Sequence, residues 1–245
     1  AHQAAARKMD AESFVLLKNE GGLLPLNKTG QSIAVIGPMI HQRTALLGSW
    51  TLDGLSEETQ TIDEAMRAAA PQAMARRAND ALSDEMVRAA LAADLSVVFV
   101  GESNRSSGEN NNIASITLPP GQEELVEAVG ALGKPVVVVV LAGRALDLSR
   151  VARCADAVLY ALHPGSLGAA ALADVLFGNT APSGRLPGTL PRSTGQIPAH
   201  YNFKSTGRTF DGVGRGDVGP YPERNRYADL PGAPLYPFGF GLADT

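Results

Sequence analysis

Two glutamates lie in a long polar stretch of the chain, GESNRSSGENNNIASITLPPGQ, which covers residues 101–122. Glu102 directly follows an apolar segment, so we expect it to hold the base of a loop by capping a turn or accepting backbone amides. Glu109 lies between Gly108 and three asparagines, residue types that allow sharp bends and left-handed backbone conformations. Such a loop can carry a carboxyl group away from its own domain, where it can exchange a proton with a substrate. Taken alone, Glu109 is interpreted more simply as a solvated surface residue.

Trp50 is the only tryptophan and belongs to the motif GSW, on a predicted loop near the end of a strand. A single tryptophan most often packs in a protein core. The alternative is a platform for a sugar, because the flat indole face suits the apolar C–H face of a pyranose. Both interpretations stay open at this point.

Several other chemistries lack their sequence signatures. IAVIGP could begin a dinucleotide-binding fold, but no GxGxxG follows that strand and no GxxxxGK occurs in the chain. The absence of GxSxG argues against a serine hydrolase of the nucleophile-elbow type. The four histidines are His2, His41, His163 and His200, and they form no HExxH motif. We therefore expect no metal site and no cofactor.

The composition excludes further classes of protein. The chain has 245 residues, of which 44% are hydrophobic, and its formal net charge is −4. It has no strongly basic patch, so neither nucleic acid nor an anionic membrane is expected as its main partner. The longest apolar run, VVVVVLAG at 136–143, is too short to span a bilayer. Cys154 is the only cysteine, which excludes an internal disulfide and is best explained as a small buried residue.

Apolar segments alternate with helical patterns in the first three quarters of the chain. We predict strands at 32–37, 95–101, 134–143 and 155–162, and helices at 4–20, 82–94, 119–133 and 166–178. Ser83 is the expected N-cap of the second helix, and Gly21-Gly22 is expected to end the first. The strands are apolar throughout, which favours a sheet covered on both faces. The pattern predicts an α/β fold with a mostly parallel sheet sandwiched between helices.

After Gly178 the chain becomes rich in proline, glycine and aromatic residues. A disordered tail would contain few aromatic residues. We therefore predict an ordered, irregular extension over 191–245 that packs on the sandwich or on a neighbouring domain. The α/β domain is placed at 31–190, and residues 1–30 form an N-terminal helix and linker. The aromatic residues of the C-terminal part are Tyr201, Phe203, Phe210, Tyr221, Tyr227, Tyr236, Phe238 and Phe240.

A set of motifs resembles the C-terminal α/β domain of glycoside hydrolase family 3, and most closely its bacterial periplasmic β-glucosidase type. The motifs follow one another over nearly the whole chain: SFVLLKNEGGLLPL, ALLGSW, VVFVGE, SGE before a polar loop and LPPGQ, ALADVLFGNTAPSGRLP, GQIPAHYNFKSTGR and RYADLPGAPLYPFGFGL. The resemblance implies retaining hydrolysis of terminal, non-reducing β-D-glycosyl residues. In that family, an N-terminal (β/α)8 barrel supplies an aspartate nucleophile and the α/β domain supplies the acid/base glutamate.

By this resemblance Glu109 is the expected acid/base and Trp50 flanks the sugar subsite next to the leaving group. Ser107, Asn110 and Asn111 are expected to assist in binding the substrate. The lack of an initiator Met also predicts that the chain is part of something longer, and residues 1–30 then link it to the barrel. We find no segment that resembles the nucleophile strand of the barrel, so this chain alone is expected to be inactive.

The expected partners are a β-linked oligosaccharide or aryl glycoside and the barrel domain, from the same gene or a separate chain. A homodimer is also considered, and the resemblance implies a periplasmic or secreted location. Two alternatives stay open. The asparagines after Glu109, and Leu167 where the family usually has a glutamate, leave room for a non-catalytic carbohydrate-binding or scaffold module. The second alternative is a nucleotide-dependent enzyme on a doubly wound sheet. The absence of phosphate-binding glycines from the sequence argues against it.

Overall fold

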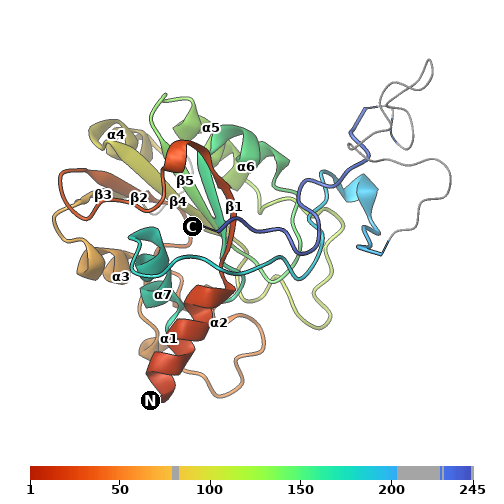
Figure 1. Cartoon of the computed structure of the whole chain (residues 1–245), viewed down its shortest axis with the longest axis horizontal. Coiled ribbons are helices and arrows are strands. Elements are labelled where there is room, and N and C mark those ends of the chain that lie inside the picture. The colour runs from red at the N-terminus through yellow and green to blue at the C-terminus, as the bar shows by residue number, and fades with distance from the viewer. Residues whose placement is uncertain (79–82, 203–226, 228, 244–245) are drawn as a thin grey trace.

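The computed structural model describes residues 1–78, 83–202, 227 and 229–243 (Figure 1). Within these residues, six strands form one sheet in the order β1-β6-β5-β4-β2-β3. The strands are β1 (Val15–Asn19), β2 (Ile33–Ile36), β3 (Met74–Ala78), β4 (Leu95–Gly101), β5 (Val136–Leu141) and β6 (Ala157–Tyr160). Strands β2 to β6 pair in parallel, and β1 lies antiparallel to β6 at one edge. The prediction of a mostly parallel sheet is confirmed.

The sheet is buried on both faces because its strands are apolar at successive positions. Val97 and Phe99 of β4 pack into one core, and Val98 and Val100 pack into the other. All residues of β2, β4, β5 and β6 are buried. Since neighbouring side chains along a strand point to opposite faces, an unbroken apolar strand must be covered on both sides. The alternation of strands and helices along the chain provides that cover.

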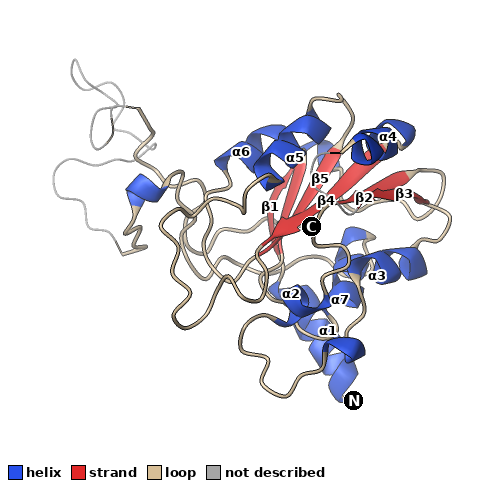
Figure 2. Cartoon of the chain, turned by 180° about the vertical axis from the view of Figure 1, so that it is seen from behind, coloured by secondary structure: helices blue, strands red, loops and turns tan. Residues whose placement is uncertain are grey.

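Helices cover the two faces of the sheet as separate layers (Figures 1 and 2). One layer contains α1 (His2–Ser13), α2 (Arg43–Leu47), α3 (Ile62–Ala69) and α7 (Gly168–Leu176). The other contains α4 (Asp84–Ala92), α5 (Gln122–Gly130) and α6 (Ser149–Cys154). Short 3-10 turns lie at Glu20–Gly22, Ser56–Glu58 and Thr194–Gln196. Among the described helices, none has the length and apolar character needed to cross a bilayer.

The predicted helix over 4–20 is wrong in its second half. The helix ends at Ser13, and Val15–Asn19 forms the edge strand β1. Phe14 and Leu16 pack into one core and Val15 and Leu17 into the other, which is the two-residue period of a strand. A short apolar run is compatible with either element, and here pairing with β6 decides for the strand.

The helices expected in the middle of the chain are confirmed, with shorter bounds. Ser83 caps α4 as predicted, since its hydroxyl accepts a hydrogen bond from the Met86 amide at 3.3 Å. Elements α2, α3, β3 and α6 were not predicted. The signal for α3 is present in the sequence, because Thr61 and Glu64 form a capping box at its start. By contrast, α2 and α6 are too short to show a helical period.

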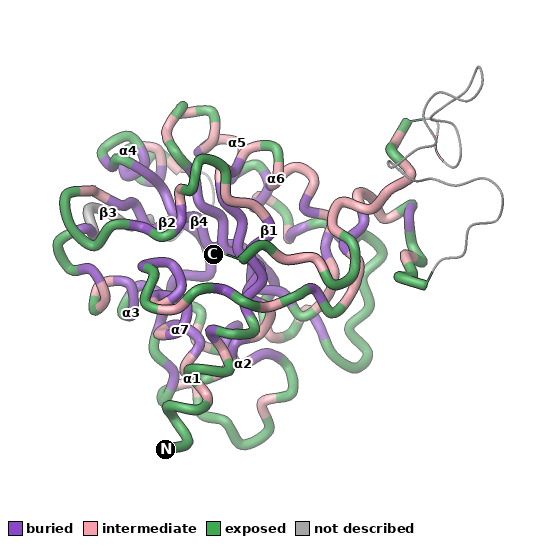
Figure 3. The backbone as a smooth tube through the Cα atoms, viewed as in Figure 1, coloured by how far each residue is buried: buried purple, intermediate pink, exposed green. Residues whose placement is uncertain are grey.

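The described part of the C-terminal extension returns to the α/β domain. The Leu186 amide donates to the Phe240 carbonyl at 2.9 Å, and the Leu242 amide donates to the Leu16 carbonyl of β1 at 2.8 Å. Leu190 and Tyr236 form an isolated antiparallel bridge. Figure 3 shows the buried strands beside this half-buried and exposed segment. Of the predicted extension over 191–245, residues 203–226, 228 and 244–245, with Phe203, Phe210 and Tyr221, lie outside the described residues.

Candidate functional site

The order of the parallel strands determines where a site can form. The chain passes from β2 outwards to β3 and then returns to the other side of β2 to form β4. At such a reversal, the loops after the two central strands turn in opposite directions and leave a crevice at the carboxyl ends of the strands. The loop after β2 carries Trp50, and the loop after β4 carries Glu109. The fold therefore brings these two predicted residues to the same edge of the sheet.

The loop after β4 is anchored where it leaves the sheet. The Gln122 side chain, at the start of α5, accepts from the Gly101 amide at 2.7 Å and donates to its carbonyl at 2.9 Å. Gly101 has a φ of 146°, and a Cβ there would lie 1.9 Å from the Leu141 carbonyl oxygen. Only glycine fits this position, because the neighbouring strand β5 is too close for any side chain.

Glu102 holds the base of the loop, as the sequence predicted, but through a different partner. Its side chain is buried, and its Oε1 lies 2.9 Å from Nε of Arg144, which follows β5. The sequence predicted a turn cap or contacts with backbone amides instead. The Tyr160 hydroxyl, at the end of β6, donates to the Arg144 carbonyl. Burial raises the pKa of Tyr160, and the negative charge of Glu102 raises it further, so the hydroxyl stays protonated.

Glu109 lies at the tip of a tight turn. The Asn111 amide donates to the Gly108 carbonyl at 3.2 Å, which closes a four-residue turn with Glu109 at its second position. Asn110 follows with a φ of 64°, a left-handed conformation that asparagine tolerates well. The predicted role of asparagine in bending this loop is confirmed at Asn110. Glu109, Asn110 and Asn111 are all exposed, so the turn presents its side chains to the surroundings.

The Trp50 loop lies against this turn. A Cβ on Gly108 would be 2.7 Å from Ser49 Oγ and 3.6 Å from Trp50 Nε1, so the two loops meet at the residue before Glu109. Trp50 is 68% exposed, which rules out the core-packing interpretation within the described structure. An exposed indole next to the turn that carries an exposed carboxyl group is suited to a sugar, because the indole can stack on the ring and the carboxyl group can exchange a proton with the glycosidic oxygen.

His163 contacts both connections, through α2 in the connection that carries Trp50 and through Ser107 in the loop that carries Glu109. Its Nδ1 lies 3.1 Å from the Ala45 carbonyl, and its Nε2 lies 3.2 Å from the Ser107 hydroxyl. A carbonyl can only accept, so Nδ1 carries a proton, and in the neutral ring Nε2 then accepts from Ser107. Ser107 is only 4% exposed. Its contacts favour a role in holding the loop, while its part in substrate binding stays a prediction.

Arg144 and His163 belong to this region but were not expected as site residues from the sequence. The available signal was their placement directly after β5 and β6, which neighbour β4 in the sheet. Among the described residues, no group of three or more His, Cys, Asp or Glu side chains could hold a metal ion.

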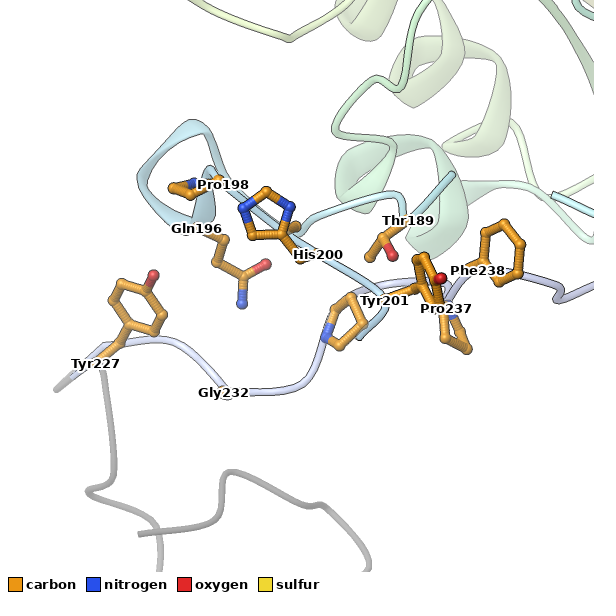
Figure 4. Close-up of a pocket in the computed structure, with 11 residues that line it drawn as sticks. Thr189, Gln196, Pro198, His200, Tyr201, Tyr227, Gly232, Pro237 and Phe238 are labelled. Carbon is orange, nitrogen blue, oxygen red and sulfur yellow. The ribbon is translucent and has the colours of Figure 1, made fainter. Parts of the chain in front are cut away.

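A pocket lies in the C-terminal extension (Figure 4). It has a volume of about 350 Å³, and none of the predicted site residues lines it. The Tyr201 and Phe238 rings stack at one end with centroids 4.8 Å apart. Gln196 lines the middle, where its amide nitrogen donates to the Pro231 carbonyl at 3.0 Å. The pocket is thus mainly aromatic and proline-rich.

Comparison with known proteins adds the family context. The sequence profile of the glycosyl hydrolase family 3 C-terminal domain matches residues 14–243. The periplasmic beta-glucosidase of Salmonella typhimurium is 38% identical over 100% of this chain, which spans 35% of that protein. A putative beta-xylosidase of Formosa agariphila is 35% identical over 97% of the chain and 31% of its own length.

A solved structure, the beta-glucosidase from Listeria innocua in complex with glucose, superposes with a TM-score of 0.88 at 35% identity. That match covers 98% of this chain and 33% of the Listeria protein. The chain thus spans about a third of the length of the relatives that it matches. The family profile, the sequence relatives and the superposed fold agree over nearly all of its residues. The chain therefore belongs to the glycosyl hydrolase family 3 C-terminal domain family.

Proposed function

We propose that the chain supplies the acid/base half of the active site of a retaining β-glycosidase. The other half is an N-terminal (β/α)8 barrel with the aspartate nucleophile, encoded in the same gene or in a separate chain. The observation that carries the proposal is the turn that presents Glu109 beside Trp50, at the carboxyl edge of the sheet. The glycosidases among the relatives, each about three times as long as this chain, support it.

In the proposed reaction, protonated Glu109 donates its proton to the glycosidic oxygen while the aspartate attacks the anomeric carbon. The leaving group departs as an alcohol, and a covalent glycosyl-enzyme remains. Glu109, now ionised, takes a proton from water as the water displaces the aspartate and releases the sugar. This sequence requires the two carboxyl groups to lie about 5–5.5 Å apart, so the turn must reach the barrel. Trp50 flanks the sugar subsite next to the leaving group.

The proposed substrates are β-linked oligosaccharides and aryl glycosides with a terminal, non-reducing β-D-glycosyl residue. β-Xylosides belong in the same assay, because a relative of similar identity carries the name beta-xylosidase. Asn110 and Asn111 are exposed on the turn. Asn110 offers its amide group to sugar hydroxyls, whereas the Asn111 side-chain amide nitrogen donates to the Ser107 carbonyl at 3.1 Å, so Asn111 offers mainly its amide oxygen. The name of the Salmonella relative supports a periplasmic or secreted location. A homodimer is part of the proposal and is tested by measuring the mass of the full-length protein in solution.

The test compares Glu109→Ala with Glu85→Ala, which removes an exposed carboxyl group on α4. Both changes are made in the protein that includes the N-terminal part. We expect Glu109→Ala to lower kcat/KM on cellobiose by about 10²–10⁴-fold, the usual contribution of a general acid. Dinitrophenyl β-glucoside, whose leaving group needs no proton, should retain most of its kcat/KM. Added azide should restore turnover and yield a glycosyl azide, since azide attacks the intermediate without a general base.

Unchanged cellobiose hydrolysis in Glu109→Ala would place the acid/base elsewhere. Sugar binding without Glu109-dependent turnover would instead support the non-catalytic carbohydrate-binding module of the same fold. Glu85→Ala should match the parent protein on both substrates, which excludes a general effect of removing a surface charge.

A further inference from the structure

The guanidinium group of Arg144 closes the loop segment that carries Glu109. Its Nη2 donates to the Ser106 carbonyl before the turn and, at 3.1 Å, to the Asn111 carbonyl at the end of the turn. Its Nε binds Glu102 at the base of the loop. One side chain from the connection after β5 therefore contacts three points of the loop, with Glu109 between two of them.

The contacts of Arg144 affect Glu109 by fixing the loop backbone rather than by placing a charge near its carboxyl group. The Arg144 side chain is 20% exposed and that of Glu102 only 3%, so the two opposite charges form a pair that is largely shielded from water. Their fields largely cancel at a distance. The hydrogen bond from Tyr160 to the Arg144 carbonyl also holds the backbone from which this side chain extends. What reaches Glu109 is the restraint on the loop backbone.

Glu109 itself depends on that restraint. Its side chain is exposed at the tip of a turn, where little packing can hold it. A proton donor must lie within hydrogen-bond reach of the glycosidic oxygen, and a displacement of 1 Å can reduce the rate about 10²-fold. The position of the carboxyl group therefore depends on the backbone on either side of it. Arg144 holds that backbone at Ser106, before the turn, and at Asn111, the last residue of the turn. The Asn111 side-chain amide nitrogen adds a hydrogen bond to the Ser107 carbonyl at 3.1 Å.

We propose that Arg144 is a positioning residue for Glu109, which it places by bridging the Ser106 and Asn111 carbonyls from its ion pair with Glu102. The proposal rests on the proposed acid/base role of Glu109. Arginine suits this role because its planar fork offers five N–H donors in fixed directions. A lysine keeps the charge opposite Glu102, but its single nitrogen at the end of a flexible stem cannot hold all three acceptors in one geometry.

The experiment uses Arg144→Lys and Arg144→Met in the protein that includes the N-terminal part. The readout is the ratio of kcat/KM on cellobiose to kcat/KM on dinitrophenyl β-glucoside. We expect both variants to lose about 10–100-fold on cellobiose, as displacement of a catalytic group predicts. The loss on the dinitrophenyl substrate should be much smaller, because its leaving group needs no proton. Arg150→Met is the matched control, since Arg150 pairs with the helix carboxylates Glu123 and Glu127 instead of the loop.

A purely structural role for Arg144 predicts equal losses on the two substrates, because fewer molecules would be folded, and that result would overturn the proposal. Arg144→Lys should stay folded, as judged by its thermal unfolding, so it decides the question if Arg144→Met does not fold. If both Arg144 variants keep the parent's ratio of kcat/KM on the two substrates while Glu109→Ala loses cellobiose hydrolysis, the positioning role of Arg144 is overturned and the acid/base role of Glu109 stands. Unchanged cellobiose hydrolysis in Glu109→Ala would overturn both the acid/base role of Glu109 and the positioning role of Arg144.

Discussion

Glu102 and Glu109 belong to the same loop but differ in burial and in the groups that surround them. Glu102 is 2% exposed and paired with Arg144, so removing its partner would leave a buried charge without compensation. Glu109 is exposed on the tip of the turn and is free to meet a substrate. The polar loop thus holds one carboxyl group fixed within the domain and presents the other to its surroundings.

Trp50 provides a prediction about binding that is separable from stability. Trp50→Ala in the protein with its N-terminal part should reduce kcat/KM on cellobiose by about 2- to 10-fold, since aromatic contacts contribute roughly 0.5–1.5 kcal/mol. The melting temperature should hardly change, because the indole is 68% exposed. Trp50→Phe keeps a flat ring, so its kcat/KM on cellobiose should lie between those of the parent and Trp50→Ala. A large fall in melting temperature for Trp50→Ala would show that the indole is structural.

Asp10 on α1 is a second carboxyl group with an unusual environment. Its Oδ2 is buried without a hydrogen-bond partner among the described residues, and this burial raises its pKa to about 6. In the unfolded chain an aspartate has a pKa of about 3.9. Between about pH 4 and pH 6, Asp10 is therefore mostly protonated in the folded protein and mostly ionised in the unfolded chain. The free energy of unfolding should fall as the pH rises from about 4 to about 6.

Asp10→Asn removes this dependence. At pH 7 we expect the variant to be more stable by about 1 kcal/mol, a figure reduced for solvent screening because the side chain is only half-buried. At pH 4 the variant and the parent should agree. Urea unfolding of the 245-residue chain at the two pH values measures the difference. Glu12→Gln, on an exposed position of the same helix, is the control. The same difference at both pH values would exclude Asp10 as the titrating group.

At the scale of elements, the site depends on the close approach of three strand ends. Gly143 follows β5, and a Cβ there would lie 2.4 Å from His163 Nε2 and 2.7 Å from Ser107 Oγ. His163 follows β6 and Ser107 follows β4, so all three connections converge on this point. The hydrogen bond between Ser107 and His163 exists because the middle connection carries no side chain here.

Gly143→Ala should therefore break the Ser107–His163 contact and displace the Glu109 loop. We expect the chain to lose about 1–3 kcal/mol of stability, as for other overpacked positions. The protein with its N-terminal part should also lose kcat on cellobiose. Gly188→Ala is the matched control, because a Cβ at Gly188 meets no atom within 4 Å. Equal effects of the two changes on unfolding and on turnover would argue against a close contact at Gly143.

At the scale of the whole molecule, the proposed reaction is divided between two domains. The chain spans about a third of the length of its relatives, and the motif expected for the aspartate nucleophile was not found in its sequence. We expect the purified 245-residue chain to show no turnover of aryl β-glucosides. Activity should return when the N-terminal part is present, covalently or as a second chain. Clear Glu109-dependent turnover by the isolated chain would show that the second carboxyl group is within it.

The fold class could be predicted from the sequence because its signal is local. Strands such as VVVVVL of β5 are apolar at every position, and only a sheet covered on both faces can bury them. The bend at Asn110 was equally predictable, since it depends on the conformational preference of one residue type. The edge strand β1 was not, because FVLL is compatible with a helix or a strand until its pairing with β6 is known.

The amino-acid pattern alone was enough to predict a layered α/β domain with an unusual polar loop, and its motifs pointed to Glu109. The residues that hold that loop became visible in the folded chain. Arg144 and His163 lie far from Glu109 along the chain, and they reach its loop because β4, β5 and β6 are neighbours in the sheet. Strand order follows from the burial of many side chains together, so no local pattern of residues specifies these contacts.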